Sequence, residues 1–227
     1  GNFLEWLEKN VKLFTDRTAR RAMDFAERCD NSGILLELNP SKSDKMSDLP
    51  SPPLPPGKYR ILYADPPWKY SDELIEGYGA ATHHYPPLSI DELCSLDVEN
   101  LAVETSILFL WCTAPFLEEV FRIVRAWGFE YKASFIWDKI RHNYGHYNSV
   151  RHEVLLLCTR GSCLPDNKEL HDSVVSLERT KTHSEKPAYF RELIDQMYTP
   201  PKEQIDRIEL FARGELPKHW HKWGNEP

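Results

Sequence analysis

The sequence lacks any long hydrophobic run and any pair of closely spaced cysteines. No apolar stretch reaches the roughly 18 residues that a membrane-spanning helix needs, and no secretory leader is expected. The five cysteines, at positions 29, 94, 112, 158 and 163, form no Cys-x-x-Cys pair. An odd set of this kind predicts reduced thiols, and therefore a cytoplasmic protein, or a nuclear one if its source is eukaryotic.

Glycine is also scarce, and negative charge outweighs positive charge. Only ten glycines occur, and none of them forms a Gly-x-Gly-x-x-Gly turn, so motifs of this type name no cofactor. The formal net charge is -7 and the pI is about 5.7. A self-sufficient nucleic-acid binder usually carries a basic face. If this chain acts on nucleic acid, local patches or a partner must supply the attraction.

Three regions follow one another along the chain. Residues 1–38 form a helical extension whose apolar residues recur at helical spacing, which predicts a docking face for the same domain or for a second copy. Residues 39–57 are rich in proline and predict an extended linker. Residues 58–227 alternate apolar strand-like runs with helical segments. This alternation predicts a three-layer α/β domain with a mostly parallel sheet.

Within the third region, the apolar runs predict strands at 60–65, 106–113, 132–137, 152–159 and 206–213. Helices are predicted from Pro115 to a stop at Gly128 and over residues 186–199. Ligands of parallel sheets bind outside the carboxyl ends of the strands. The side chains expected at those ends are Asp65, Thr113, Asp138, Arg160 and Arg213.

The octapeptide YADPPWKY, residues 63–70, puts a carboxylate, two prolines and a tryptophan at the end of the first strand. Two successive prolines suit neither a helix nor a central strand. The set Asp65, Pro66, Pro67 and Trp68 suits methylation of an aromatic amine such as that of adenine. The Asp65 carboxylate and the Pro66 carbonyl can each accept one N–H, which turns the nitrogen lone pair toward an electrophilic methyl group. Trp68 offers a flat face for the base, worth about 1–3 kcal/mol by stacking.

These residues resemble the MT-A70 family of N6-adenine methyltransferases, which use S-adenosylmethionine. Besides DPPW, the resemblance includes the segments YPPLSIDEL, ILFLWCT, FIWDK, RHEVLLLCTRG, HSEKP and IELFARGELPKHWHKWGNE, and it covers about residues 58–226. It implies a Rossmann-like methyltransferase fold in permuted order, with the catalytic half first and the cofactor half last. It also implies an enzyme that methylates adenine N6 in nucleic acid. The compact chain favours DNA slightly over RNA.

The resemblance further implies which residues contact S-adenosylmethionine. The expected cofactor contacts are Asp65, Lys186, Arg213, Asn225 and Glu226. Lys186 precedes Pro187 at the start of a predicted helix, and a helix N-terminus together with an ammonium group favours a carboxylate such as that of the cofactor. Glu215 and Leu216 depart from the family pattern, because the best-known eukaryotic members carry a histidine and an asparagine there. Glu226 also stands where those members have a glutamine.

On the substrate side, the resemblance implies that Tyr85 and Glu153 contact the target nucleotide. Trp137 and Lys139 are expected to do so because they end a strand beside the proposed pocket. Residues 138–153 and 178–186 mix basic with aromatic side chains, which suits a single-stranded or flipped-out nucleotide. His142 and His146 are four residues apart, like metal ligands. Gly145 argues against a helix there and no third ligand has suitable spacing, so no metal is expected.

Two other functions stay open at the level of the sequence. A non-catalytic partner subunit would position nucleic acid for another chain, but such subunits usually carry a damaged catalytic motif, and this one is intact. An amine methyltransferase acting on cytosine N4 or on a glutamine side chain would use a related Asp/Asn-Pro-Pro-aromatic site. The N-terminal helix and the acidic pI also predict a homodimer or a heteromeric partner.

Overall fold

The computed structural model describes residues 53–69, 87–141, 147–180 and 185–224. The predicted helical extension, residues 1–38, and all but the end of the linker, residues 39–57, lie outside this part of the chain. Their predicted roles therefore stay predictions. The α/β region is described apart from its internal gaps and its last three residues.

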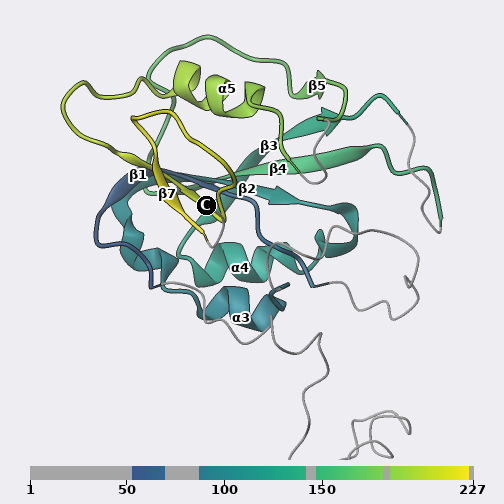
Figure 1. Ribbon diagram of the computed structural model, residues 1–227, viewed down its shortest axis with the longest axis horizontal. Coiled ribbons are helices and arrows are strands. Elements are labelled where there is room, and N and C mark those ends of the chain that lie inside the picture. The colour runs from purple at the N-terminus through teal and green to yellow at the C-terminus, as the bar shows by residue number, and fades with distance from the viewer. Residues whose placement is uncertain (1–52, 70–86, 142–146, 181–184, 225–227) are drawn as a thin grey trace, which may run out of the picture. The chain divides into compact units, whose positions relative to one another are not determined.

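A seven-stranded sheet forms the centre of the described region, in the order β5-β3-β4-β2-β1-β6-β7 (Figure 1). The strands are β1 (Tyr59–Ala64), β2 (Ala102–Cys112), β3 (Glu130–Asp138), β4 (His152–Arg160), β5 (Val174–Ser176), β6 (Arg207–Leu210) and β7 (His221–Trp223). β1 is parallel to β2 and β6, β3 to β5, and β6 to β7, whereas β4 is antiparallel to both β2 and β3. All described strands except β4 therefore point the same way, which confirms the predicted mostly parallel sheet.

Helices cover both faces of this sheet (Figure 1). The helices are α3 (Ile90–Ser95), α4 (Val120–Ala126) and α5 (Tyr189–Met197), with short 3-10 turns η2 (Val98–Leu101) and η3 (Ala114–Phe116). Successive residues of β1 point to opposite faces. Leu62 packs in the core formed with α3 and α4, whereas Ile61 packs in the core formed with α5. The predicted three-layer α/β architecture is confirmed.

Local signals fix the helix ends on the α3 and α4 face. Ser89 caps α3, because its hydroxyl accepts the N–H of Glu92 at 3.2 Å while the Glu92 carboxylate accepts the Ser89 N–H at 2.7 Å. Gly128 follows α4 with a φ of 77°, a left-handed conformation that favours glycine, so the predicted stop is confirmed. Buried Trp127 donates from Nε1 to the Leu93 carbonyl at 2.8 Å and so joins the two helices into one layer.

The direction of β4 corrects one expectation about the strand ends. A parallel β4 would have put Arg160 at the carboxyl edge of the sheet. Because β4 is antiparallel, Arg160 lies at the opposite edge, where it donates to the Glu99 carbonyl at 2.9 Å. The same reversal brings the amino end of β4 to the carboxyl edge, with Glu153 opposite Trp137 in the register.

Several element boundaries also differ from the predicted ones. β2 begins at Ala102 rather than 106, and the helix predicted from Pro115 splits into η3 and α4. β6 ends at Leu210 because Phe211, with a φ of 61°, leaves the extended conformation. β5 and β7 lie outside the predicted strands, since three residues are too few to show a periodic pattern. None of the described helices is long and apolar enough to cross a membrane.

Candidate active site

Asp65 follows β1 directly, at the carboxyl end of a strand near the middle of the sheet. Its backbone N–H donates to the carbonyl of Leu210, the last residue of β6, at an N···O distance of 3.5 Å. The chain is therefore held against its neighbour where it leaves the sheet. The Asp65 side chain is 22% exposed, so its carboxylate is partly sheltered but can be reached.

Two backbone hydrogen bonds with Leu88 fix the course of the chain where it passes through Pro66 and Pro67 after β1. The Leu88 N–H donates to the Pro67 carbonyl at 2.8 Å, and the Lys69 N–H donates to the Leu88 carbonyl at 3.1 Å. Proline has no N–H, so residues 66 and 67 offer only acceptors. Within the part of the chain that the structure describes, no hydrogen bond engages the Pro66 carbonyl. That oxygen stays available as an acceptor next to Asp65.

The Trp68 ring is packed into the core rather than displayed at the surface. The residue is 8% exposed, and its ring stacks on Phe116 of η3 at a centroid distance of 4.9 Å and an interplanar angle of 19°. Its Nε1 is buried and makes no hydrogen bond with any described residue. One face of the indole is therefore covered, and a base can stack only on the rest of the ring.

Four charged side chains of alternating sign meet at this edge of the sheet. Lys186, just before α5, donates from Nζ to Oδ2 of Asp65 at 2.6 Å, and the same Nζ lies 3.3 Å from Oε2 of Glu153. Oε1 of Glu153 accepts a hydrogen bond from Lys139, which follows β3. The four side chains form a continuous row and are between 11% and 22% exposed. The antiparallel course of β4 makes this row possible, because it supplies the central carboxylate.

Burial and ion pairing have opposing effects on the pKa values of Asp65, Glu153 and Lys186. Burial raises the pKa of Asp65; Lys186 opposes that rise and the Glu153 charge adds to it. Burial would also raise the pKa of Glu153, but Lys186 and Lys139 outweigh it and the pKa is lowered. Burial disfavours the charged form of Lys186, but Asp65 and Glu153 outweigh this effect and raise its pKa. Of the two carboxylates, Asp65 is therefore the one that takes up a proton more easily.

Two tryptophans lie beneath the lysines of the row. The Lys186 Nζ is 5.4 Å from the Trp111 ring centroid, and the Lys139 Nζ is 4.9 Å from that of Trp137. Trp137, a predicted substrate contact, is 3% exposed and donates from Nε1 to the Leu177 carbonyl at 2.9 Å. Trp111 is absent from the predicted site, although an aromatic near the end of the strand predicted at 106–113 was an available signal. Both rings support the lysines by cation–π contact.

Of the remaining predicted residues, the structure describes only Arg213. It follows β6 and is half-buried, and its positive charge lowers the pKa of Asp65, so it lies within electrostatic reach of that carboxylate. Tyr85, Asn225 and Glu226 lie outside the described residues. Their predicted roles stay predictions.

A buried carboxylate that sequence reasoning missed lies on β6. Glu209 is 7% exposed and is the register partner of Tyr63 on β1. Its Oε2 lies 2.8 Å from Nε of Arg191 on α5, although neither atom makes a well-aligned hydrogen bond with any described residue. Burial raises the pKa of Glu209 to about 7, against the opposing charge of Arg191. The available signal was an acid inside the apolar run IELF.

The histidines near the end of the described chain have protein partners. Nε2 of His219 lies 2.7 Å from Oδ2 of Asp195, and Nδ1 of His221 lies 2.7 Å from the Tyr59 hydroxyl. In the described ranges, no three His, Cys, Asp or Glu side chains are grouped so as to hold a metal ion. The segment 142–146, with its two histidines, lies outside those ranges.

The chain is similar in sequence to known proteins over most of its length. The family model described as MT-A70 matches residues 59–226. The chain is 34% identical over 193 residues to the Type II methyltransferase M.MunI of Mycoplasma sp, with 77% of this chain and 80% of that protein covered. It is 27% identical over 179 residues to the human N(6)-adenosine-methyltransferase catalytic subunit METTL3, with 75% of this chain but 28% of that protein covered.

The N(6)-adenosine-methyltransferase MT-A70-like protein of Drosophila melanogaster gives the same 27% identity with 27% of its length covered. The chain thus spans most of the Mycoplasma protein and little more than a quarter of the human and Drosophila proteins. Because the family match extends over most of the sequence, this chain belongs to the MT-A70 family and is a methyltransferase.

Proposed function

We propose that the protein transfers the methyl group of S-adenosylmethionine to the exocyclic N6 amine of adenine in nucleic acid, with DNA as the first acceptor to test. The observation that carries the proposal is the pairing of Asp65 with Lys186 at the end of β1, beside the Pro66 carbonyl, which accepts no hydrogen bond from any residue that the structure describes. The human and Drosophila relatives are named as N(6)-adenosine-methyltransferases. This chain spans little more than a quarter of those proteins. We therefore propose the same target amine, N6 of adenine, and leave the choice between DNA and RNA to experiment.

The charges at the end of β1 fit the cofactor. The amino-acid part of S-adenosylmethionine is a zwitterion, with an ammonium and a carboxylate on one carbon. Asp65 and Lys186, 2.6 Å apart, present the complementary pair of charges. Lys186 would hold the carboxylate and Asp65 would face the ammonium, while Arg213, Asn225 and Glu226 would contact the nucleoside part. The bound cofactor supplies a methyl group on a sulfonium.

The chain's own oxygens orient the amine. The Asp65 carboxylate and the Pro66 carbonyl each accept one N–H, so the nitrogen lone pair is drawn out of conjugation with the purine ring. Positive charge then develops on nitrogen, and the Asp65 carboxylate stabilises it. Asp65 also accepts the proton that the methylated amine loses, since burial raises its pKa. Glu153, 3.3 Å from the Lys186 Nζ, retains the lysine while Asp65 engages the amine.

We propose that the target base binds beside this row of charges. Tyr85, Lys139 and Glu153 would contact the nucleotide, and Trp137 would act through Lys139, whose ammonium it supports. Trp68 would contribute the part of its ring that Phe116 leaves uncovered. The net charge of -7 gives no general attraction to a polyanion, so these local groups or a second subunit must provide it.

Mass spectrometry of nucleosides tests the proposal. The protein is incubated with methyl-labelled S-adenosylmethionine and with single- and double-stranded DNA and RNA of matched sequence. N6-methyladenine is the expected product, with more in DNA than in RNA, and Asp65→Ala is expected to abolish it. Label on cytosine N4, or label on no nucleoside in any of the four polymers, would refute the assignment of the acceptor.

A further inference from the structure

Two of the described residues other than glycine have a positive φ, and their surroundings differ. Phe211 has a φ of 61° and Ile140 a φ of 65°. Phe211 is 4% exposed and packs edge-on against Trp223, with ring centroids 5.2 Å apart, so packing offsets the cost of its conformation. Ile140 is 44% exposed and belongs to neither apolar core of the described region. A positive φ is especially unfavourable for a β-branched residue, so Ile140 is held in this conformation without a gain in packing.

Ile140 is the central residue of a tight turn that follows β3. The Arg141 N–H donates to the Lys139 carbonyl at 2.6 Å, a hydrogen bond that encloses a single residue. This bond, together with the positive φ of Ile140, defines a γ-turn of the rare and strained kind. Ile140 therefore lies at the tip of the turn, where its side chain reaches solvent.

Contacts from three strand ends keep the turn in this conformation. Oδ1 of Asp138, the last residue of β3, accepts the Ile140 N–H at 2.9 Å. Oδ2 of Asp138 accepts hydrogen bonds from Nη2 of Arg151 at 3.0 Å and from the Ser176 hydroxyl, at the end of β5, at 3.2 Å. Just before β4, the Arg151 carbonyl accepts the Lys139 N–H at 2.8 Å. Backbone strain that the surrounding structure maintains in this way is typical of functional sites.

The turn lies beside the charged row at the carboxyl edge of the sheet. Lys139, directly before Ile140, contacts Glu153, the central carboxylate of that row. Arg141, directly after Ile140, carries a second positive charge, which is exposed and lies 3.2 Å from Glu178. Ile140 is thus an exposed apolar side chain between two cations. This arrangement suits a nucleic acid, whose phosphates attract cations and whose bases present apolar faces.

We propose that Ile140 contacts the nucleobase next to the target adenine and so helps to expose the adenine to Asp65. The inference rests on the proposed function, which places a nucleic acid at this edge of the sheet. An enzyme that modifies a base takes it out of the stack, and an apolar side chain inserted beside the neighbouring base stabilises that state. The strained turn displays Ile140 before the nucleic acid arrives, so less conformational freedom is lost on binding.

Methyl-transfer kinetics and thermal unfolding of the whole chain test this inference, with the polymer that the unsubstituted protein methylates best. Ile140→Gly removes the side chain and is compatible with a positive φ. We expect the KM for nucleic acid to rise about tenfold and the KM for S-adenosylmethionine to stay unchanged. Tm should stay unchanged or rise by up to about 4 °C, because strain is relieved. Ile140→Leu keeps the apolar surface and is expected to restore the KM for nucleic acid.

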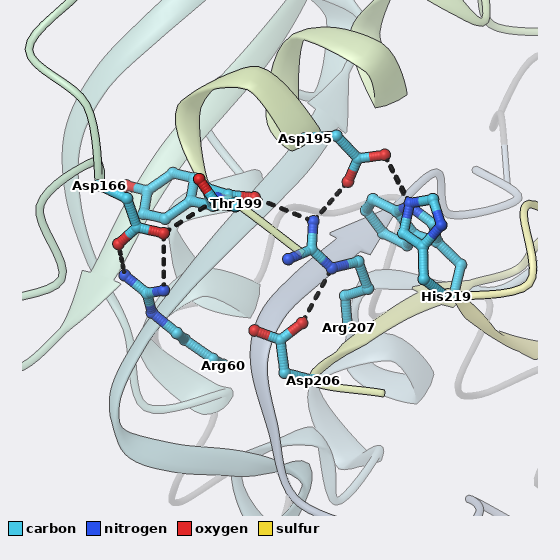
Figure 2. A network of polar contacts seen from close by, with 9 residues as sticks. Arg60, Asp166, Asp195, Thr199, Asp206, Arg207 and His219 are labelled. Atoms are coloured by element: carbon cyan, nitrogen blue, oxygen red, sulfur yellow. Dashed lines mark hydrogen bonds and ion pairs between the residues drawn. The ribbon is translucent and has the colours of Figure 1, made fainter. Parts of the chain in front are cut away.

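Leu164→Gly provides the matched control. Leu164 is 75% exposed and lies two residues before Asp166, which pairs with Arg60 near the start of β1 at 2.6 Å, at the opposite edge of the sheet (Figure 2). This variant is expected to leave both KM values unchanged.

An unchanged KM for nucleic acid in Ile140→Gly overturns the inference, and so does an equal rise in Leu164→Gly. A lower Tm in Ile140→Gly, together with a rise in both KM values, would also overturn it, because the residue would then serve the fold alone. If the unsubstituted protein methylates no nucleic acid, the proposed function itself is refuted.

Discussion

The ammonium of Lys186 donates to Oδ2 of Asp65 at 2.6 Å and is shared with Glu153 on its other side. Burial raises the pKa of Asp65, and the two neighbours then act in opposite directions, because Lys186 lowers this pKa and Glu153 raises it. Asp65 must be ionised to stabilise the positive charge on the amine and to take its proton. Substitutions at the two neighbouring positions should therefore move the pH dependence of methyl transfer in opposite directions, a pattern that a general loss of stability would not produce.

Asp65→Asn tests the role of the Asp65 carboxylate directly. The amide keeps one acceptor oxygen and the shape of the side chain, but it cannot stabilise positive charge or take a proton. We expect kcat to fall by about 100- to 1,000-fold or more, measured as transfer of labelled methyl groups to nucleic acid. Asp172→Asn, at an exposed position, serves as the control and should retain full activity. Normal turnover in Asp65→Asn would contradict the mechanism.

Lys186→Met removes the cation and keeps the length of the side chain. Burial and Glu153 then raise the pKa of Asp65 against Arg213, which no longer has help from Lys186, so the acid limb of the kcat profile should move to higher pH. The Kd for S-adenosylmethionine should rise about 10- to 100-fold, since a charge-assisted hydrogen bond to its carboxylate is lost. Lys132→Met, which removes a mostly exposed lysine paired with Glu130, should change neither quantity. An acid limb that stays in place would show that Lys186 does not control Asp65.

Glu153→Gln should have the opposite effect on the pH profile. Its negative charge is one of the causes that raise the pKa of Asp65, so its removal should move the acid limb to lower pH. Lys139 loses its partner at the same time, and we expect a raised KM for nucleic acid. The pH profile of kcat checks the first effect, with Glu130→Gln as the exposed control. A shift toward higher pH would be incompatible with the proposed arrangement of charges.

The sequence predicted the place of Asp65 correctly because its signals are local. An apolar run followed by an acid and two prolines marks the end of a buried strand, and Asp65 lies there. The resemblance to the family named Lys186 and Glu153, but not the contacts that join them. Those contacts require β4 to be antiparallel, and a continuous apolar run reads the same in either direction.

Tryptophans show a second limit of sequence reasoning. Trp68 and Trp137 follow or end apolar strands beside the site, so the sequence predicted faces open to a base or a nucleotide. Both are more than nine-tenths buried, because Phe116 covers one ring and the layer around α5 encloses the other. Whether an aromatic is displayed or packed depends on distant segments, which local composition does not reveal.

Glu209 leads to a prediction about stability rather than rate. Burial raises its pKa from about 4.5 to about 7 in the folded protein, so the folded state binds this proton more tightly than the unfolded chain does. Below pH 4.5 both states are protonated and the contribution to stability is complete. As the pH rises through about 7, the contribution is lost, and the free energy of unfolding should fall by at most about 3 kcal/mol.

Glu209→Gln removes this titration while preserving the size of the buried side chain. Denaturant unfolding at several values between about pH 5 and pH 8 gives the free energy of unfolding for both proteins. The stability of the unsubstituted protein relative to Glu209→Gln should decrease steadily as pH rises, whereas Glu203→Gln, at an exposed position, should show no such trend. The loss is limited by Arg191, which pairs with the ionised carboxylate. A difference that is constant or grows with pH would mean that Glu209 is already ionised in the folded protein at pH 5.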